Sequence, residues 1–393
     1  MHYLTLGHSP DLSLLELKSR SIKTETLSAR LVFTDNSEIL SLAPELAGIT
    51  RVIEQVKPTS QDSLLADLTA LVRDSKVKNH AITNYSNLTV TQNDLYQLRT
   101  TVKETRPVRF LSFDTTGHSL IAIRKQHVAE FSIINHNSQL VIGRTVWIQD
   151  ADEWSNRDRS RPYQDITRGM LPPKIARVLV NLATQGKKSL PADRNGLPAD
   201  RNGLPADRNG LPADRQGKLL DPFCGTGTIL MEASLLGYEV VGSDNDQKAI
   251  EGSKANLEWL TSSDHMLSTK YQVLLSDATH IDEHLESIDY IATEPYLGPL
   301  LSHKNLPPHQ KLLNIARGLD KLYRGALRSW LKILAPGGRV VIVIPEFHAY
   351  NTIIPTLKID TIASLGYNYV DSVTYSKPGA IVVRNITILE KNK

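Results

Sequence analysis

The chain has 393 residues, of which 40% are hydrophobic and 22% are charged, and its net charge is +3. This composition is typical of an ordinary soluble globular protein, and the length suggests two or three domains. The small net charge permits nucleic-acid binding but does not argue for it, so any basic surface has to be local.

Signals for a membrane, for secretion and for disulfides are missing from the sequence. No apolar run is long enough to cross a bilayer, and the first eight residues lack the basic-then-apolar order of a signal peptide. The single cysteine, Cys224, excludes an internal disulfide and a cysteine-built zinc site. We therefore expect a cytoplasmic protein without a membrane segment or a metal.

The N-terminal part alternates between strand and helix patterns. Residues 1–56 predict a small ferredoxin-like domain, with strands at 3–6, 29–34 and 50–56 and helices at 12–17 and 39–47. Residues 57–150 predict a second α+β segment, with helices at 64–72 and 93–103. Its strands are expected at 81–85, 108–112, 119–123, 131–134 and 145–149.

The segment 57–150 also contains cations that could form one basic face for RNA. They are Lys103, Arg106, Arg109, Arg124 and Lys125. A solvated surface with scattered charges is the simpler interpretation of these residues from sequence alone.

Residues 151–173 predict a linker in which Arg157, Arg159 and Arg161 lie close to Trp154 and Tyr163. Arginines next to aromatic rings suit phosphate contacts and base stacking. They equally suit a hinge that docks by ion pairs onto the next domain. Pro172 and Pro173 end this segment and open a helix that we expect from Lys174 to Thr184.

A heptad, Leu-Pro-Ala-Asp-Arg-Asn-Gly, then repeats four times over 190–217, with Gln216 replacing the asparagine of the last copy. A proline and a glycine in every copy forbid a continuous coiled coil, and Asp and Arg cancel in each unit. The repeat stands where a short helix-to-strand connection belongs. We interpret it as a flexible, low-complexity surface insertion without an assigned function.

The stretch 219–244 predicts a strand–helix–strand unit with a small-molecule site at its first turn. It begins Leu-Leu-Asp-Pro-Phe-Cys-Gly-Thr-Gly-Thr, continues as an apolar helix and ends a second strand at Asp244. The proline favours an extended Asp221 at the end of the first strand. Gly225 and Gly227 let the backbone bend tightly and approach a ligand closely.

The residues of this turn indicate which nucleotide it takes. It lacks the Gly-Lys-Ser/Thr of a triphosphate loop and the third glycine of a dinucleotide loop. An acid, Asp221, stands at its mouth, where it repels phosphate but suits the ammonium of a methionine. The ligand implied is S-adenosylmethionine, whose ribose Asp244 can hold. A structural turn without a ligand is the alternative, which the length of the motif disfavours.

The remaining residues return to strand–helix alternation and predict a doubly wound sheet with an antiparallel finish. Strands are expected at 271–275, 290–293, 339–344, 367–374 and 382–390, and helices at 310–334 and 352–365. The run His280-Ile281-Asp282-Glu283-His284 matches an inverted zinc-protease signature. We interpret it as an exposed polar turn. Cys224 is interpreted as a packing residue, which disfavours carbon-5 methylation of a pyrimidine.

In the order of these segments the chain resembles the THUMP-domain tRNA guanosine-N2-methyltransferases and the related putative RNA methylases. The motifs that carry the resemblance are Arg157-Asp158-Arg159-Ser160-Arg161-Pro162, the helix Lys174-Ile175-Ala176-Arg177-Val178-Leu179-Val180-Asn181-Leu182-Ala183, and Asp221-Pro222-Phe223-Cys224-Gly225-Thr226-Gly227-Thr228. The resemblance implies a Rossmann-like methyltransferase domain at 174–393, after a THUMP-like RNA-binding domain at 57–150. Structured RNA, in particular tRNA, is the implied partner.

The family's pattern also implies roles for single residues. Those expected to bind S-adenosylmethionine are Asp221, Phe223, Gly225, Gly227, Thr228, Asp244, Asn245, Asp277 and Ala278. Within this set Asp221 and the glycine turn would hold the methionine half. Asp244 would hold the ribose, and Asp277 would meet the adenine edge.

The target-base motif departs from the family's pattern. Relatives carry Thr-Asp-Pro-Pro-Tyr-Gly, where this chain has Thr293-Glu294-Pro295-Tyr296-Leu297-Gly298. Glu294 and the Pro295 carbonyl can still accept hydrogen bonds from an exocyclic amine, and Tyr296 can stack on the base. We therefore expect these three residues to be catalytic in methylation of a base amine, which the resemblance implies is guanosine N2. Alternatively, Glu294 only caps the loop that follows it and has no catalytic role.

Two other functions stay open from the sequence. A DNA or other amino-methyltransferase is one, because the Glu-Pro-Tyr motif does not exclude adenine as the target. A non-enzymatic RNA-binding homologue, whose altered motif has lost its chemistry, is the other. The sequence does not predict an oligomeric state.

Overall fold

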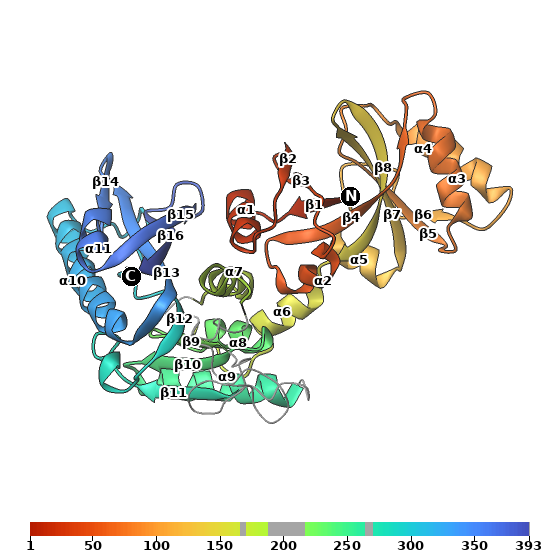
Figure 1. The fold of residues 1–393 in the computed structure, drawn as a ribbon. Coiled ribbons are helices and arrows are strands. Elements are labelled where there is room, and N and C mark those ends of the chain that lie inside the picture. The colour runs from red at the N-terminus through yellow and green to blue at the C-terminus, as the bar shows by residue number, and fades with distance from the viewer. Residues whose placement is uncertain (166–169, 188–216, 264–269, 393) are drawn as a thin grey trace. The chain divides into compact units, whose positions relative to one another are not determined.

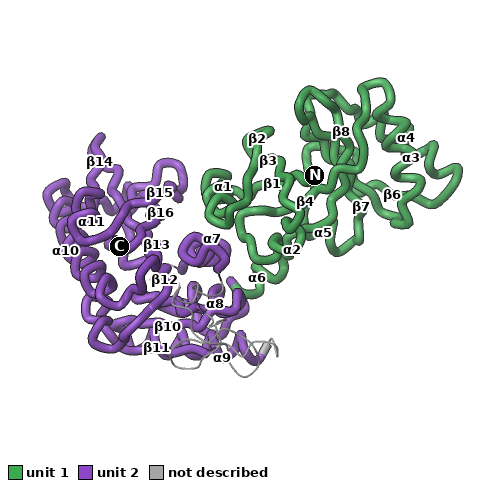
Figure 2. Tube along the Cα trace, viewed as in Figure 1, with its two compact units in different colours: residues 1–157 green, residues 158–393 purple. Residues whose placement is uncertain are grey.

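The computed structural model describes residues 1–165, 170–187, 217–263 and 270–392. They belong to two compact units, unit 1 (Met1–Arg157) and unit 2 (Asp158–Lys393), each of which has its own sheet (Figures 1 and 2). The predicted insertion at 190–217 lies outside the described residues, apart from its last glycine.

Unit 1 is built on one eight-stranded sheet in the order β2-β3-β1-β4-β8-β7-β5-β6. Its strands are β1 (His2–Leu6), β2 (Glu25–Ser28), β3 (Leu31–Thr34), β4 (Ile49–Thr59), β5 (Asn79–Asn84), β6 (Arg109–Phe110), β7 (Val128–His136) and β8 (Gln139–Ile148). Its helices are α1 (Pro10–Ser19), α2 (Ile39–Leu42), the 3-10 turn η1 (Ala43–Glu45), α3 (Leu64–Asp74), α4 (Gln92–Lys103), α5 (Leu120–Lys125) and α6 (Ala151–Arg159), which ends in unit 2.

The long strand β4 joins the two segments that the sequence separates. The expected boundary after residue 56 falls inside β4, which pairs with β1 on one side and with β8 on the other. The structure therefore describes one compact unit where the sequence predicts two domains. The expected linker likewise begins as a helix, α6.

The strand expected at 119–123 is wrong, because this run forms α5. Its apolar residues give a short apolar run without a clear period, and such a run cannot distinguish a strand from one buried helical turn. In the structure Ile123 is buried while Ile121 is exposed. Tertiary packing against β7 decides the outcome.

Unit 2 has a sheet in the order β11-β10-β9-β12-β13-β16-β15, with β14 added to β13. Its strands are β9 (Lys218–Asp221), β10 (Glu239–Asp244), β11 (Tyr271–Leu275), β12 (Ile288–Thr293), β13 (Leu334–Ala349), β14 (Thr352–Pro355), β15 (Tyr367–Tyr375) and β16 (Val382–Lys391). Its helices are α7 (Pro173–Thr184), α8 (Thr228–Leu235), α9 (Gln247–Ser263), the 3-10 turn η2 (Ile281–Glu283), α10 (His309–Ile333) and α11 (Ile359–Ser364).

The pairing of these strands confirms the predicted doubly wound sheet and its antiparallel finish. Strands β11, β10, β9, β12 and β13 pair in parallel with one another, whereas β16 is antiparallel to both β13 and β15. The helix expected at 352–365 is wrong in its first part, because 352–355 form β14. Tyr350 and Asn351 both have a φ of 55°, which turns the chain back onto β13.

The core of unit 2 places the carboxyl ends of the parallel strands at one edge. Helix α10 buries an apolar stripe that includes Leu319 and Trp330 against Leu220 and Ile291 of the sheet. Helix α7 packs on α8, β12 and β13. The strand order reverses between β9 and β12, and a ligand site in such a sheet lies at the carboxyl ends of the strands beside this reversal.

Candidate active site

The ends of β9 and β12 meet at this reversal. Strand β9 ends at Asp221 and β12 ends at Thr293, whose Oγ1 donates a 2.7 Å hydrogen bond to Asp221 Oδ1. The backbone N–H of Phe223 donates to the same oxygen at 3.2 Å. Only 2% of Asp221 is exposed, so its carboxyl is held in place almost without water.

The electrostatics of Asp221 suit a cationic ligand. The pKa of its carboxyl is raised from 3.8 to about 7, mainly by burial. The charges of Asp244 and Glu294 add to this rise, and the hydrogen bonds from Thr293 and Phe223 oppose it. A positive group beside this carboxyl would restore its ionised form. The residues therefore fit the ammonium and sulfonium groups of S-adenosylmethionine and oppose a phosphate.

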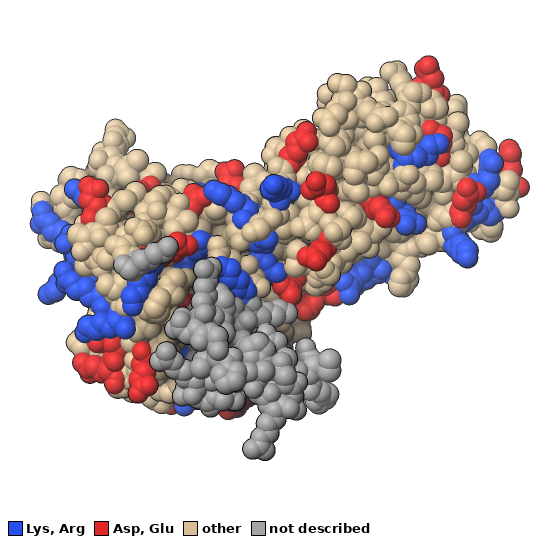
Figure 3. Space-filling view, in the orientation of Figure 1, with Lys and Arg blue, Asp and Glu red and all other residues tan. Residues whose placement is uncertain are grey.

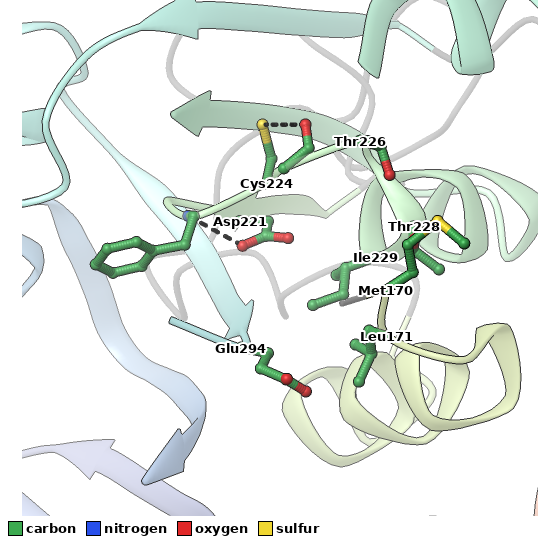
Figure 4. Close-up of a pocket in the computed structure, with 10 residues that line it drawn as sticks. Met170, Leu171, Asp221, Cys224, Thr226, Thr228, Ile229 and Glu294 are labelled. Atoms are coloured by element: carbon green, nitrogen blue, oxygen red, sulfur yellow. Dashed lines mark hydrogen bonds between the residues drawn. The ribbon is translucent and has the colours of Figure 1, made fainter. Parts of the chain in front are cut away.

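An open pocket lies beside Asp221 (Figure 4). The predicted site residues that line it are Asp221, Phe223, Gly225, Thr228 and Glu294. The lining residues that were not predicted as site residues are Met170, Leu171, Cys224, Thr226 and Ile229. The pocket thus brings a predicted cofactor residue and a predicted catalytic residue together.

The two glycines of the turn have different physical roles. Gly225 has a φ of +50° and Gly227 a φ of +82°, a region that L side chains rarely adopt. A Cβ at Gly227 would lie 2.5 Å from Ser253 Oγ, whereas a Cβ at Gly225 would meet nothing within 4 Å. Gly227 thus lets the turn pack against α9, and Gly225 leaves the backbone open toward a ligand.

Asp244 supports the glycine turn from the end of β10. Its Oδ2 accepts a 3.0 Å hydrogen bond from the Gly225 N–H, and its Oδ1 accepts one from Asp246. These bonds leave lone pairs on both oxygens, so a ribose contact stays compatible with the geometry. Neither Asp244 nor the exposed Asn245 lines the pocket that contains Asp221.

The residues expected at the adenine lie at the end of β11. Asp277 accepts hydrogen bonds from the N–H and the hydroxyl of Thr279, and these bonds hold its pKa below the usual value. The buried Ala278 accepts a 3.1 Å bond from Trp330 Nε1 at its carbonyl. Asp277 therefore also closes a local turn, and its role at the adenine stays a prediction.

The target-base motif follows β12 at the rim of the pocket. Glu294 lines the pocket (Figure 4). Its carboxylate lies 3.5 Å from Arg384 Nε. Pro295 is buried, and the exposed Tyr296 is fixed through its carbonyl, which accepts a 2.7 Å bond from Tyr323 Oη. The ring of Tyr296 is free to meet a base arriving from solvent.

Two arginines of the predicted RNA-binding set are corrected by the structure. Arg157 is buried, pairs with Glu153 at 2.6 Å and lies over the Trp154 ring. Arg161 is also buried and donates to Thr228 Oγ1 at 2.6 Å. Both are therefore unavailable to phosphates. Arg159 is exposed, and RNA contact by it stays a prediction.

The other predicted RNA-binding cations lie in unit 1. Arg124 pairs with Asp150 and Lys125 with Asp152, at 2.6 and 3.1 Å, and Arg106 donates to the Val77 carbonyl. Lys103 and Arg109 are exposed. Figure 3 shows Lys and Arg interspersed with Asp and Glu on the visible face of unit 1. Arg124 and Lys125 are also exposed, so a single basic face formed by these cations stays a prediction.

The run from His280 to His284 contains the turn η2, where Asp282 pairs with Lys332 at 2.6 Å and accepts a bond from Ser329. Across the described ranges no group of three or more His, Cys, Asp or Glu side chains is arranged to hold a metal. Nor does any helix in the described part of the chain combine the length and the apolar character needed to span a bilayer.

The doubly wound sheet, the glycine turn and the acidic pocket at the strand reversal define a methyltransferase domain of the S-adenosylmethionine-dependent class. Residues 212–363 match the UPF0020 family, described as the RMKL-like methyltransferase domain. The C-terminal part of this chain is therefore similar to that family's methyltransferase domain.

The chain is also similar in sequence to named tRNA methyltransferases. The chain is 30% identical over 212 residues to the tRNA (guanine(10)-N2)-dimethyltransferase of Methanothermobacter thermautotrophicus, covering 54% of this chain and 49% of the relative. It is 29% identical over 217 residues to the protein of the same name from Pyrococcus abyssi, covering 52% and 49%. A tRNA (guanine(6)-N2)-methyltransferase of Thermus thermophilus is 33% identical over 134 residues, covering 32% and 33%.

The chain thus spans about half the length of the first two relatives. These matches confirm that about half of the chain resembles the tRNA guanine-N2-methyltransferases. The THUMP-like character of the second segment of unit 1 stays a prediction.

Proposed function

We propose that the protein uses S-adenosylmethionine to methylate the exocyclic N2 of a guanine in tRNA. The observation that carries the proposal is one pocket that contains both Asp221, a buried carboxyl suited to a cation, and Glu294, an acceptor at the rim. The names of the relatives support guanine N2 of tRNA as the target.

The residues that would hold S-adenosylmethionine are Asp221, the backbone at Gly225 and Asp244. When bound, it supplies an electrophilic methyl group on a positively charged sulfur. Asp221 would stabilise that positive charge and hold the methionine half of the cofactor in a fixed orientation. Orientation of this kind can contribute on the order of 7–11 kcal/mol to the lowering of a barrier.

Glu294 and Tyr296 act on the target base. The Glu294 carboxylate accepts an N–H of the amine, which leaves the nitrogen lone pair directed at the methyl carbon. It also takes up the proton that the nitrogen releases once the new N–C bond has formed. Tyr296, which is 58% exposed, stacks on a base that has left its helix.

Unit 1 is the proposed RNA-holding part. Lys103 at the end of α4 and Arg109 in β6 are exposed cations that suit phosphate contacts. A THUMP-like role for unit 1 and a cytoplasmic location belong to the same proposal.

The proposal is tested by incubating the full chain with labelled S-adenosylmethionine and unmodified tRNA transcripts, followed by nucleoside mass spectrometry. We expect N2-methylguanosine or N2,N2-dimethylguanosine. Transcripts in which guanine 10 or guanine 6 is replaced by adenine then locate the target. Methylated adenine in a DNA control would instead favour the amino-methyltransferase alternative.

The role of Glu294 is tested separately. Glu294→Ala should abolish turnover while calorimetry shows unchanged binding of S-adenosylmethionine. Full turnover by this variant would refute its catalytic role. Cofactor binding without any product from the unaltered protein would favour the RNA-binding homologue.

A further inference from the structure

Strand β16 brings an arginine to the pocket from a distant part of the sequence. Because β16 runs antiparallel to β13, its first residues lie at the edge where the parallel strands end. In the observed register Arg384 is opposite Pro345 of β13 and Tyr375 of β15. Its backbone N–H is fixed by a 2.9 Å hydrogen bond to Ser376 Oγ.

This register places Arg384 against the acid that follows β12. Its Nε lies 3.5 Å from Glu294 Oε1, and the two side chains are 37% and 19% exposed. A pair that is shielded to this extent interacts more strongly than a fully solvated one. The contact involves the inner half of the guanidinium, so it restrains the direction in which the Glu294 carboxylate points.

The other groups around Glu294 are neutral or acidic. They are Asp221 at the end of β9, Tyr323 of α10 and Tyr375 of β15, each of which interacts electrostatically with Glu294. Among these described groups Arg384 supplies the positive charge. Burial raises the pKa of Glu294, and Arg384 opposes that effect.

We propose that Arg384 is a positioning residue that fixes the Glu294 carboxylate at the pocket and keeps it in the state that accepts an amine N–H. A protonated Glu294 would present a donor on one oxygen, and it could not take up the proton that the amine releases. The effect of Arg384 on methylation rests on the proposed function. Its effect on the ionisation of Glu294, which we call the electrostatic part, does not, because it concerns the protein without substrate.

The electrostatic part is tested without RNA. In protein labelled with 13C at the glutamate carboxyls, the Glu294 signal is assigned by its loss in Glu294→Gln and is followed through a pH titration. We expect the midpoint for Glu294 to move to higher pH in Arg384→Gln and to stay near the unaltered value in Arg384→Lys. An unchanged midpoint in Arg384→Gln would overturn the inference.

The catalytic part is tested by the pH profile of single-turnover methylation of tRNA. Arg384→Gln should lose about tenfold in rate near pH 6.5 and much less near pH 9, because alkaline conditions ionise Glu294 without help. Arg384→Lys should recover most of the loss. Arg328→Gln, which changes an exposed arginine of α10, is the matched control and should leave the profile unchanged.

The possible outcomes separate the two proposals. An equal loss at every pH in Arg384→Gln, or an unaltered profile, would overturn the positioning role. Failure of the unaltered protein to methylate any RNA would overturn the proposed function, whereas the Glu294 titration would still decide the electrostatic part. If Arg384→Gln does not fold, Arg384→Lys compared with Arg384→Met in the same titration decides it.

Discussion

Thr293 Oγ1 donates a 2.7 Å hydrogen bond to Asp221 Oδ1 and thereby joins the ends of the two strands between which the strand order reverses. Asp221 lies on the proposed cofactor side of the pocket. Thr293 immediately precedes Glu294, which lies on the proposed target side. This single hydrogen bond therefore links the proposed cofactor residue, Asp221, to the strand end that precedes the proposed catalytic residue, Glu294.

Removing this bond should weaken cofactor binding at neutral pH. The Thr293 hydroxyl lowers the pKa of Asp221, so Thr293→Val should raise it and leave more of the carboxyl protonated. We expect about tenfold weaker binding of S-adenosylmethionine by calorimetry at pH 7 and a smaller difference at pH 9. Thr293→Ser, which keeps the hydroxyl, is the control. Equal loss in both variants would assign the effect to packing.

Binding of S-adenosylmethionine should depend on pH through Asp221. Because the pKa of this carboxyl is about 7, the affinity should fall about tenfold for each pH unit below that value and level off above it. Asp221→Asn should bind weakly at every pH. A pH-independent affinity in the unaltered protein would show that Asp221 does not face the cation.

The same carboxyl sets a pH dependence of stability in the ligand-free protein. Its pKa in the fold, about 7, lies above the ordinary 3.8, so its contribution is complete below pH 3.8 and is lost as the pH rises through 7. Urea unfolding should therefore show Asp221→Asn gaining stability relative to the unaltered protein between pH 5 and pH 8. A constant difference across this range would contradict the assignment.

Replacing Gly227 with alanine should mainly affect stability, whereas replacing Gly225 should mainly affect cofactor binding. Gly227→Ala places a Cβ 2.5 Å from Ser253 Oγ and should lower the free energy of unfolding by more than the roughly 1–2 kcal/mol that a left-handed residue costs. Gly225→Ala meets no protein atom within 4 Å, so its loss of stability should stay near that cost. Its larger effect should be on S-adenosylmethionine binding. Urea unfolding and calorimetry measure the two quantities, and an equal loss of stability would contradict the distinction.

The exposed cations of unit 1 should contribute to tRNA binding. Lys103→Gln and Arg109→Gln should each weaken binding and reduce the slope of log affinity against log salt concentration by about one unit for each phosphate that the variant no longer binds. Lys57→Gln is the matched control, because Lys57 pairs with Asp67 at 2.6 Å and is outside the predicted RNA-binding set. Filter binding over a range of salt concentrations measures the slope. Equal effects of all three variants would argue against a specific RNA surface.

Several features of the site could be predicted because they are local. The turn from Asp221 to Gly227 is continuous in sequence, and its extended acid and its two left-handed glycines follow from backbone sterics. Glu294 was expected at the target base from the resemblance to the family, and it lies beside this turn because the carboxyl ends of neighbouring parallel strands meet at one edge of a sheet.

Other features could not be predicted because their partners are remote in sequence. Met170 and Leu171 read as part of a linker, yet they line the pocket. Arg161 reads as a phosphate-binding residue, but its Nη1 bonds to Thr228, 67 residues further along the chain. The single sheet of unit 1 depends on the pairing of β4 with β8, which no local pattern reveals.

The sequence by itself determined the doubly wound domain and the cofactor turn, since both follow from the hydrophobic period and backbone preferences of neighbouring residues. Glu294, the acid of the target motif, followed from the resemblance to the methyltransferase family. Only the tertiary structure decided which charges surround those acids. Arg384 meets Glu294 because β16 runs antiparallel to β13, and strand direction and register are set by packing over the whole sheet rather than by local preference.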